Sequence, residues 1–233
     1  KAGFYEGETA QLIVEEMKRG QGIISLEDLK KYEAAYRTPH RFTYKDFVIV
    51  SMPMPSSGGL LLNQMMKMVE KRELGKMGFQ TTASVQLMTE VMRRAYADRA
   101  AYMGDADFYP VPVRAITQEA YLKKRMEDYD PTKASESKNI NPGVVLKKES
   151  EETTHLSVID AEGNAVAVTT TLNNSYGSRT VIGGGGFFIN DEMDDFSVQP
   201  GVPNMYGALG GEANAIQPGK RMLSSMTPTL VLK

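Results

Sequence analysis

The sequence has no cysteine and no tryptophan among its 233 residues. The absence of cysteine excludes disulfide bonds, thiolate metal sites and a cysteine nucleophile, but it does not fix the compartment. No run of eighteen or more apolar residues is present, so no segment has the pattern of a membrane-spanning helix. The formal net charge is only −2, which provides no basic footprint for nucleic acid or an anionic membrane.

The composition that remains is ordinary for a globular protein, with 41% hydrophobic and 24% charged residues. A length of 233 residues allows one large domain or two small ones, with enough chain to form a hydrophobic core. The opening KAGFYEGETAQ lacks both an initiator Met and a signal-peptide pattern, and the final TPTLVLK stops within an expected strand. We therefore expect a fragment of a longer protein, whose localisation the missing leader leaves open.

Charged residues and helical periodicity dominate residues 1–152. The segment EGETAQLIVEEMKRGQG predicts a helix that ends at Gly20. In the next segment, Ser25 is a plausible N-cap with Asp28 three residues later. RFTYKDFVIVSM alternates and predicts a strand, and the turn cluster PMPSSGG leads into an apolar helix, GLLLNQMMKMVEKREL. The expected buried face of the first helix carries Ala10, Ile13, Val14 and Met17.

Two further helices are predicted before residue 130. Thr117 is expected to cap the second of them, TQEAYLKKRMEDYD. From Asp130 to Glu152 the chain is rich in Ser, Lys, Asn and Pro without a sustained period, which predicts an exposed, accessible linker. The first helix, TTASVQLMTEVMRRAYADRAAYM, has an expected buried face made of Val85, Met88, Val91, Met92 and Ala95.

Residues 153–233 carry far fewer charges and about half of the glycines. THLSVID and NAVAVTTTL predict paired strands joined across Asp160–Gly163, and the second is apolar on both faces, as for a strand buried between layers. GGGGFFIN and SMTPTLVLK predict two more strands. Helices before and strands after residue 153 indicate an α+β fold.

Thr153 lies at the start of the first of these predicted strands. A threonine hydroxyl needs a base to take its proton before it can attack an amide. His155 lies two residues away and on the same face of a strand, but this position controls the hydrogen-bond angle poorly, so a structural role is favoured. If the Glu152–Thr153 bond is cut, Thr153 gains an α-amine with an unperturbed pKa of about 7.7–8.0. That amine can accept the hydroxyl proton.

Several motifs together resemble the γ-glutamyltransferase family of N-terminal nucleophile hydrolases. TTHLSVID, GNAVAVTTTLN, NDEMDDFS, PGVPNMYG and KRMLSSMTPT resemble the start of the small subunit, in the order and spacing of the family. MPMPSSGG, RRAYADRAAYMGD and DFYPVPV resemble the end of the large subunit. The resemblance thus covers the whole chain with a set of motifs that is very specific.

The resemblance implies part of a four-layer αββα sandwich, made as one precursor that cleaves itself at Glu152–Thr153. Residues 1–152 then form the end of the large subunit and residues 153–233 the start of the small subunit. Both belong to one domain, and the two subunits stay associated after cleavage. In an uncut chain Thr153 has no α-amine.

The resemblance also implies roles for individual residues. Thr153 is the nucleophile of both self-cleavage and catalysis, and Thr171 orients it. Tyr206 belongs to a lid loop over the site. The residues implied in substrate binding are Asn173, Glu192 and Asp195, which hold the α-amino and α-carboxylate ends of a γ-glutamyl group, and Ser224 and Ser225, which bind the α-carboxylate.

These residue types suit that substrate. Carboxylates pair with its ammonium group, and serine hydroxyls hydrogen-bond its carboxylate. Binding remote from the scissile amide places the γ-carbonyl against Thr153, and attack gives a γ-glutamyl–Thr ester. Water then releases glutamate, or an amino acid or dipeptide accepts the γ-glutamyl group. The donors implied are glutathione and other γ-glutamyl compounds.

Other interpretations stay open. A relative that cleaves poly-γ-glutamate or a β-lactam side chain, or a non-catalytic relative, would carry much of the same sequence. NDEMDD also fits a solvated turn or, less well, a metal loop, and GGGG is more typical of a mobile turn than of a phosphate cradle. We expect no metal and no cofactor.

The resemblance places two parts of the site outside these residues, a carboxylate-binding arginine before Lys1 and an oxyanion-hole Gly-Gly motif after Lys233. Loss of one oxyanion-hole donor lowers an acyl-transfer rate by about 10²–10³-fold. The isolated chain is therefore expected to be nearly inactive. The family resemblance alone suggests a periplasmic or secreted protein.

Overall fold

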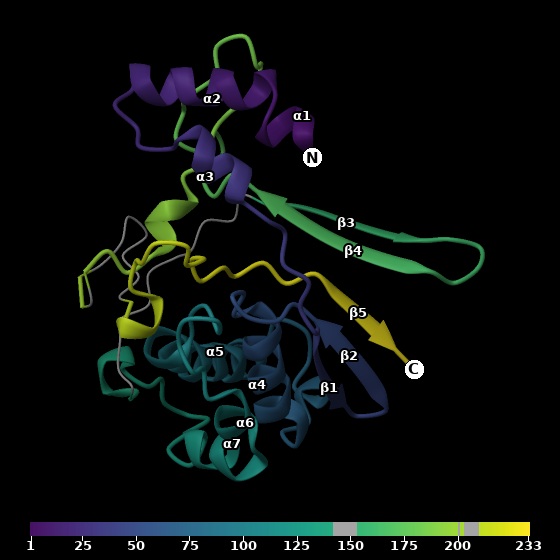
Figure 1. Cartoon of the computed structure of the whole chain (residues 1–233). Coiled ribbons are helices and arrows are strands. Elements are labelled where there is room, and N and C mark those ends of the chain that lie inside the picture. Colours follow the sequence, from purple (N-terminus) through teal and green to yellow (C-terminus); the bar gives the residue numbers. More distant parts are fainter. Residues whose placement is uncertain (142–152, 200, 203–209) are drawn as a thin grey trace. The chain divides into compact units, whose positions relative to one another are not determined.

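The computed structural model describes residues 1–141, 153–199, 201–202 and 210–233 (Figure 1). The chain forms two compact units. Each unit combines segments from before and after residue 153. The predicted boundary between residues 152 and 153 concerns cleavage of the chain, and it stays a prediction. The smaller unit comprises Lys1–Arg37 and Thr171–Glu192, and the larger unit comprises Thr38–Thr170 and Met193–Lys233.

A three-stranded antiparallel sheet belongs to the larger unit. Strand β2 (Phe47–Ser51) lies between β1 (His40–Tyr44) and β5 (Thr229–Leu232). Ser51 pairs with Thr229, and their hydroxyl oxygens are 2.8 Å apart. The sheet therefore joins the segment that precedes PSSGG to the segment that follows LSSM, as Figure 1 shows for β2 and β5.

Four helices enclose the hydrophobic core of the larger unit. They are α4 (Gly58–Glu70), α5 (Thr82–Tyr102), α6 (Val113–Thr117) and α7 (Glu119–Arg125). Helix α4 contacts α5, α6 and α7, and it also contacts strands β1 and β2. Short 3₁₀ helices lie at Leu74–Lys76, Ser137–Asn139 and Glu212–Asn214. The buried core residues are Met54, Leu60, Leu61, Met68, Leu87, Val91, Ala95, Met103, Ile116, Leu122, Met126 and Leu223.

The buried face of α5 differs from the predicted one. Val91 and Ala95 are buried as predicted, but Val85, Met88 and Met92 are exposed. These three therefore do not belong to the core, although their spacing is that of an apolar face.

Charged side chains occupy part of the buried face of α5 instead. Glu90, Arg94 and Asp98 are each at most 1% exposed. Arg94 pairs with Glu90 at 2.6 Å and with Asp128 at 2.7 Å, and Asp98 lies 3.3 Å from Arg125. Charges are buried in proteins when they are paired, so an apolar pattern alone does not locate this face.

Residues 128–141, which we call the α5 strap, contain the described part of the predicted linker. The N–H of Ser135 donates to Glu90 at 2.9 Å, and Arg93 donates to the carbonyl of Ser135 at 2.5 Å. Arg125 donates to the carbonyl of Asn141. Most strap side chains are exposed as predicted, but the backbone is held by helices. The rest of the predicted linker, residues 142–152, lies outside the described residues.

The smaller unit begins with three helices, α1 (Ala2–Tyr5), α2 (Glu8–Arg19) and α3 (Leu26–Lys31). Helix α2 ends just before Gly20, as predicted. Its buried residues are Ala10, Ile13, Val14 and Glu16.

The predicted N-cap of α3 is confirmed. The hydroxyl of Ser25 accepts from the N–H of Asp28 at 3.2 Å, and the carboxylate of Asp28 accepts from the N–H of Ser25 at 2.9 Å. This reciprocal arrangement is a capping box, which satisfies two backbone donors at the start of the helix.

No strand forms at GGGGFFIN, contrary to the prediction. Only an isolated bridge pairs Val181 with Phe188 there. Gly184 and Gly186 have φ angles of +76° and +71°. Such angles turn the chain instead of extending it, and glycine adopts them at little cost.

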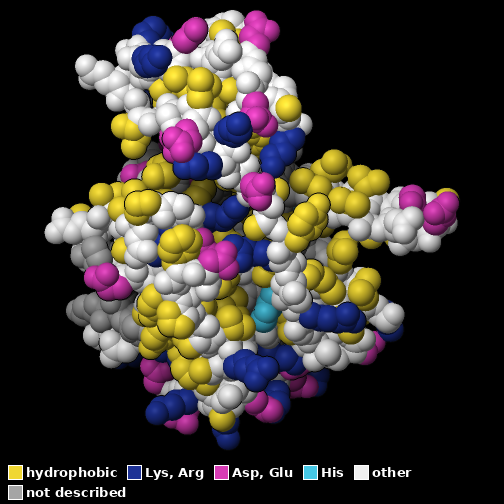
Figure 2. Space-filling view, in the orientation of Figure 1, with side chains coloured by type: hydrophobic (Ala, Val, Ile, Leu, Met, Phe, Trp, Pro, Cys, Tyr) yellow, Lys and Arg dark blue, Asp and Glu magenta, His cyan; other side chains and the backbone are white. Residues whose placement is uncertain are grey.

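Strands β3 (Thr153–Ile159) and β4 (Ala165–Thr171) form the predicted hairpin. Its turn is closed by a 3.0 Å hydrogen bond from the N–H of Asp160 to the carbonyl of Asn164. The predicted burial of the second strand is wrong for this chain, because no third strand pairs with the two and much of β4 is exposed among the described residues. Figure 2 shows the hydrophobic side chains along this hairpin.

Two other predictions need correction. RFTYKDFVIVSM contains two strands, β1 and β2, because the chain reverses at Lys45, whose φ is +52°. Thr117 does not cap a helix. It is the last residue of α6, and its hydroxyl donates back to the carbonyl of Val113 at 2.7 Å. Gln118 precedes α7 instead.

Candidate functional site

The serines of the LSSM segment lie beside those of the PSSGG segment in the larger unit. Ser224 and Ser56 form a parallel bridge. The N–H of Ser57 donates to the carbonyl of Ser224 at 2.8 Å, and the N–H of Ser224 donates to the carbonyl of Pro55 at 3.0 Å. The hydroxyl of Ser56 donates to the carbonyl of Met226 at 2.6 Å. These contacts fix the backbone on both sides of Ser225.

The two glycines of PSSGG allow this close approach. A Cβ atom on Gly58 would lie 2.1 Å from the hydroxyl oxygen of Thr227, and a Cβ on Gly59 would lie 2.3 Å from the carbonyl of Met52. Both distances are far below van der Waals contact. Any larger residue would therefore push away the chain just after LSSM or the chain just after strand β2.

Arg99, near the end of α5, contacts both serine segments. Its Nη2 donates to the hydroxyl of Ser225 at 3.0 Å, and its Nε donates to the hydroxyl of Ser57 at 2.9 Å. The hydroxyl of Ser224 accepts from the N–H of Met226 at 3.1 Å. The sequence does not predict this role for Arg99, because it lies 126 residues before Ser225 and no local pattern links them.

Asn214 ties the predicted substrate residue Asp195 to the same loop. Its side-chain amide donates to the carbonyl of Asp195 at 2.6 Å and accepts from the N–H of Leu223 at 2.9 Å. Asn214 is only 6% exposed. Sequence reasoning also missed this residue, since a buried Asn at the end of a short 3₁₀ helix has no distinguishing pattern.

Charged groups fix the chain that enters LSSM. The carboxylate of Asp105 accepts from the N–H of Arg221 at 2.9 Å. The ammonium of Lys220 donates to the carbonyl of Ala213 at 3.0 Å. Burial lowers the pKa of Lys220, and the charges of Asp105 and Glu212 partly oppose this effect.

The smaller unit carries three other predicted site residues. Thr171 and Asn173 are joined by a 2.9 Å hydrogen bond from the N–H of Asn173 to the hydroxyl of Thr171. Nδ2 of Asn173 also donates to the carbonyl of Asp191 at 3.3 Å, next to Glu192. Glu192 begins the short 3₁₀ helix η3 (Glu192–Asp195). Asn173 is thus held close to the segment that contains Glu192.

The backbone of Asn173 is in the left-handed region, with φ at +76°. Few residues other than glycine adopt this conformation, and asparagine is among the most tolerant. Uncommon backbone angles that the surroundings enforce are frequent at ligand-binding sites.

Thr153 is the first residue of β3, and its side chain is exposed. Both ring nitrogens of His155 have partners, since Nδ1 lies 2.8 Å from the hydroxyl of Thr169 and Nε2 lies 2.9 Å from that of Ser157. These contacts agree with the structural role favoured for His155. Glu152 and Tyr206 lie outside the described residues.

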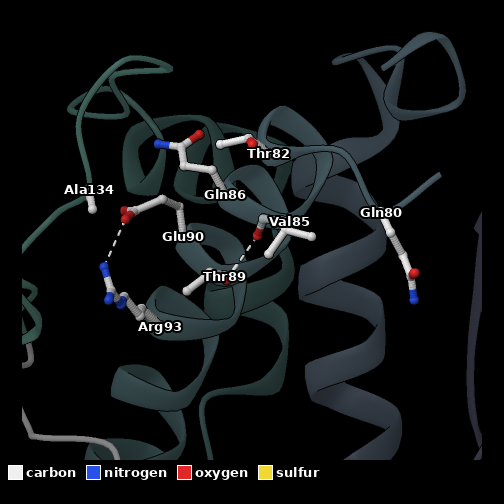
Figure 3. Close-up of a pocket in the computed structure, with 8 residues that line it drawn as sticks. All are labelled: Gln80, Thr82, Val85, Gln86, Thr89, Glu90, Arg93 and Ala134. Atoms are coloured by element: carbon white, nitrogen blue, oxygen red, sulfur yellow. Dashed lines mark hydrogen bonds and ion pairs between the residues drawn. The ribbon is translucent and has the colours of Figure 1, made fainter. Parts of the chain in front are cut away.

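A pocket of about 420 Å³ opens on α5 (Figure 3), and none of the predicted site residues lines it. Its polar groups are already paired in part, as Glu90 with Arg93 at 2.9 Å. Among the described residues, no group of three or more His, Asp or Glu side chains is placed to hold a metal ion. The residues that line the pocket are Gln80, Thr82, Val85, Gln86, Thr89, Glu90, Arg93 and Ala134.

Solved structures define the class of fold. The chain is similar to the cephalosporin acylase of Bacillus halodurans with a TM-score of 0.76 and 22% identity, over 100% of this chain and 39% of that one. It is also similar to the γ-glutamyltranspeptidase of Helicobacter pylori with a TM-score of 0.58 and 40% identity, over 64% of this chain and 43% of that one. The fold is therefore the α+β fold of N-terminal nucleophile hydrolases, as expected.

Sequence comparison gives the family. The model of the γ-glutamyltranspeptidase family matches residues 1–233. The chain is 47% identical over 230 residues to a glutathione hydrolase proenzyme of Escherichia coli (strain K12), covering 99% of this chain and 40% of that relative. The chain belongs to the γ-glutamyltranspeptidase family, and it spans about two fifths of this relative.

Proposed function

We propose that the protein containing this chain is a γ-glutamyl hydrolase and transferase that uses Thr153 as its nucleophile. The observation that carries this proposal is the match of the γ-glutamyltranspeptidase model to all of residues 1–233. Glutathione is the proposed donor, since the relative from E. coli is named a glutathione hydrolase proenzyme. Water, an amino acid or a dipeptide is the proposed acceptor.

Processing precedes activity in this proposal. Cleavage between Glu152 and Thr153 gives Thr153 an α-amine, and two pieces of the protein stay associated. The amine takes the proton from the hydroxyl, because a neutral threonine hydroxyl attacks an amide too weakly. Thr171 orients the nucleophile. The position of Thr153 at the start of a strand supports this assignment.

The substrate is held at its amino-acid end. Glu192 and Asp195 pair with the ammonium group, with Asn173 as a further polar contact. Ser224 and Ser225 hydrogen-bond the α-carboxylate, and Tyr206 covers the site. The fixed backbone around the two serines supports their role, because a site held in place before the substrate arrives loses less entropy on binding.

The reaction proceeds in two displacements. The hydroxyl oxygen of Thr153 attacks the γ-carbonyl carbon, the C–N bond breaks, and the proton passes through the α-amine to the departing amine. A γ-glutamyl ester of Thr153 remains. Water or an acceptor amine then attacks this ester, and the hydroxyl of Thr153 regains its proton as glutamate or a new γ-glutamyl compound leaves.

Processing is tested in the full-length protein by denaturing gels and intact-mass measurement. We expect two pieces, the smaller beginning at Thr153. The variant Thr153→Ala should stay in one piece, whereas the neighbouring control Thr154→Ala should still be cleaved. Cleavage of Thr153→Ala between residues 152 and 153 would refute the proposed nucleophile.

Substrate class is tested by offering three donors, namely glutathione, poly-γ-glutamate and a β-lactam with an acyl side chain. Preferred turnover of glutathione supports the proposal, and preference for another donor favours an acylase-like relative. Asp195→Ala should lose donor use severely while cleavage continues. Absence of turnover with every donor would indicate a non-catalytic relative.

No helix in the described part of the chain has the length and apolar character needed to cross a membrane. We propose a periplasmic or secreted location, which rests on the family alone. Fractionation of cells that make the full-length protein tests this location.

A further inference from the structure

Arg99 occupies a position that the proposed mechanism does not use. Its guanidinium lies between the two serine segments, with Nε 2.9 Å from the hydroxyl oxygen of Ser57 and Nη2 3.0 Å from that of Ser225. Nη2 also lies 3.5 Å from the carbonyl of Leu223. All of these groups belong to the larger unit.

The contact with Arg99 determines how the hydroxyl of Ser225 can act. A guanidinium has only donors, so the oxygen of Ser225 accepts and its own hydrogen points to another group. The oxygen of Ser224 likewise accepts, from the N–H of Met226 at 3.1 Å. Each hydroxyl therefore keeps its own hydrogen available to donate to a ligand. A carboxylate, which only accepts, is the matching ligand.

Arg99 also fixes the backbone beneath the hydroxyls. The hydroxyl of Ser57, which accepts from Nε of Arg99, donates to the carbonyl of Ser224 at 3.0 Å. One planar guanidinium therefore holds Ser225 directly and Ser224 through the hydroxyl of Ser57. Lysine has a single ammonium on a flexible stem and does not reproduce this fork.

We propose that Arg99 is a positioning residue for the α-carboxylate subsite. It orients the hydroxyl of Ser225 as a donor and places a permanent positive charge one hydroxyl away from the bound carboxylate. This inference rests on the proposed γ-glutamyl activity. Helix α5 then contributes to donor selection through Ser225, since a donor without an α-carboxylate gains nothing from Arg99.

The test compares two donors in the full-length protein. One is a γ-glutamyl anilide with its α-carboxylate, and the other is the same anilide with an α-carboxamide. The variants are Arg99→Gln and Arg99→Lys, and the matched control is Arg93→Gln on the same helix. Arg93 is also half-buried, but it contacts Glu90 and the α5 strap.

We expect Arg99→Gln to lower kcat/KM for the carboxylate donor by ~10- to 100-fold, the usual effect of losing a hydrogen bond to a charged group. Arg99→Lys should lose less, and Arg93→Gln should change little. For the carboxamide donor all three should stay close to the unsubstituted protein. A purely structural role of Arg99 would lower activity with both donors equally, and that result would overturn the inference.

A double-mutant cycle with Ser225→Ala gives a second, independent readout. If Arg99 acts through Ser225, the loss caused by Arg99→Gln should largely disappear in the Ser225→Ala background. Additive losses would overturn the inference. Gels that show normal cleavage establish folding. If Arg99→Gln fails this check, Arg99→Lys decides by the same comparison of donors.

Failure of the proposed function is distinguishable in the same experiment. No γ-glutamyl release by the unsubstituted protein would overturn the function and this inference together. Release by the unsubstituted protein with unchanged kinetics in Arg99→Gln would overturn the inference alone.

Discussion

At the scale of single residues, the loop that carries Ser224 and Ser225 depends on side chains distant in sequence. Asn214 uses both ends of its amide, toward Asp195 and Leu223, and is buried. Buried polar groups that lose such partners cost free energy, because no water replaces the contact. Asn214 therefore supports two parts of the proposed site. One is Asp195, the proposed partner of the substrate ammonium group, and the other is the loop whose serines are proposed to bind the α-carboxylate.

The variant Asn214→Leu removes both contacts. We expect a loss of ~2–4 kcal/mol in the free energy of unfolding, since two backbone groups lose their partners. Donor kcat/KM should fall as well, because Asp195 and the serine loop are no longer held. Thermal unfolding and donor kinetics of the full-length protein measure the two effects.

Asn63→Leu provides the control. Asn63 is similarly buried, with 7% of its surface exposed, and its amide nitrogen lies 3.0 Å from Nε2 of His40. It should lose stability while keeping donor kinetics at a temperature where the protein is folded. Equal kinetics of the Asn63 and Asn214 variants would show that Asn214 is a structural residue only.

At the scale of elements, α5 combines two tasks along its length. Its final turns carry Arg99 toward the serine loop. Its middle turns bind the α5 strap through Glu90, Arg93 and Arg94, and Gln86 donates to the carbonyl of Asp130 at 2.8 Å. One rigid helix thus holds both the predicted carboxylate subsite and the chain that leads toward the predicted cleavage site.

Arg94→Met should destabilise the larger unit strongly. Arg94→Met removes one of the two cationic partners of the buried Glu90 carboxylate and leaves Arg93 as the other. The cost should therefore approach, but not exceed, the ~3–5 kcal/mol that is typical of breaking a buried ion pair. The strap should also become sensitive to limited proteolysis. Lys71→Met is the control, because it breaks only an exposed pair with Glu119 and should leave urea unfolding unchanged.

The destabilisation caused by Arg94→Met should depend on pH. Burial by itself raises the pKa of Glu90, but hydrogen bonds from Arg94 and Ser135 outweigh burial and lower that pKa. A lowered pKa stabilises the folded state above the unfolded pKa, and this contribution is lost as pH falls through the folded value. The difference in stability between Arg94→Met and the unsubstituted protein should therefore shrink in acid. A constant difference would contradict the assignment.

At the scale of the whole chain, the β3–β4 hairpin exposes several apolar side chains. Val158 is 52% exposed and Ile159 72% exposed. Figure 2 shows hydrophobic side chains along the hairpin and acidic side chains at its tip. A two-stranded sheet has little stability of its own, and its unpaired edges favour association.

The 233-residue chain expressed alone is therefore expected to self-associate. Replacing Leu156 and Val158 by Thr keeps strand propensity but removes apolar area from one face, and it should reduce association. Light scattering measures the change. Ile23→Thr, at a 94% exposed site outside the hairpin, should have little effect. Equal reduction by both variants would mean that the hairpin is not the cause.

Local signals predicted local features well. The capping box of Ser25 and the stop at Gly20 depend on contacts within a few residues, and both are confirmed. The hairpin turn at Asp160 is confirmed for the same reason. The buried face of α5 was predicted only in part, because a pattern of apolar residues cannot show which charges will find partners.

By itself, the sequence determined the family, and it predicted the nucleophile and the substrate residues, because the motifs that carry them are contiguous stretches of chain. Only the tertiary structure decided what holds them in place. Arg99 meets Ser225, and Asn214 joins Asp195 to the serine loop, through contacts between separate segments. Such contacts depend on the packing of helix, sheet and loop, which no single stretch of sequence encodes.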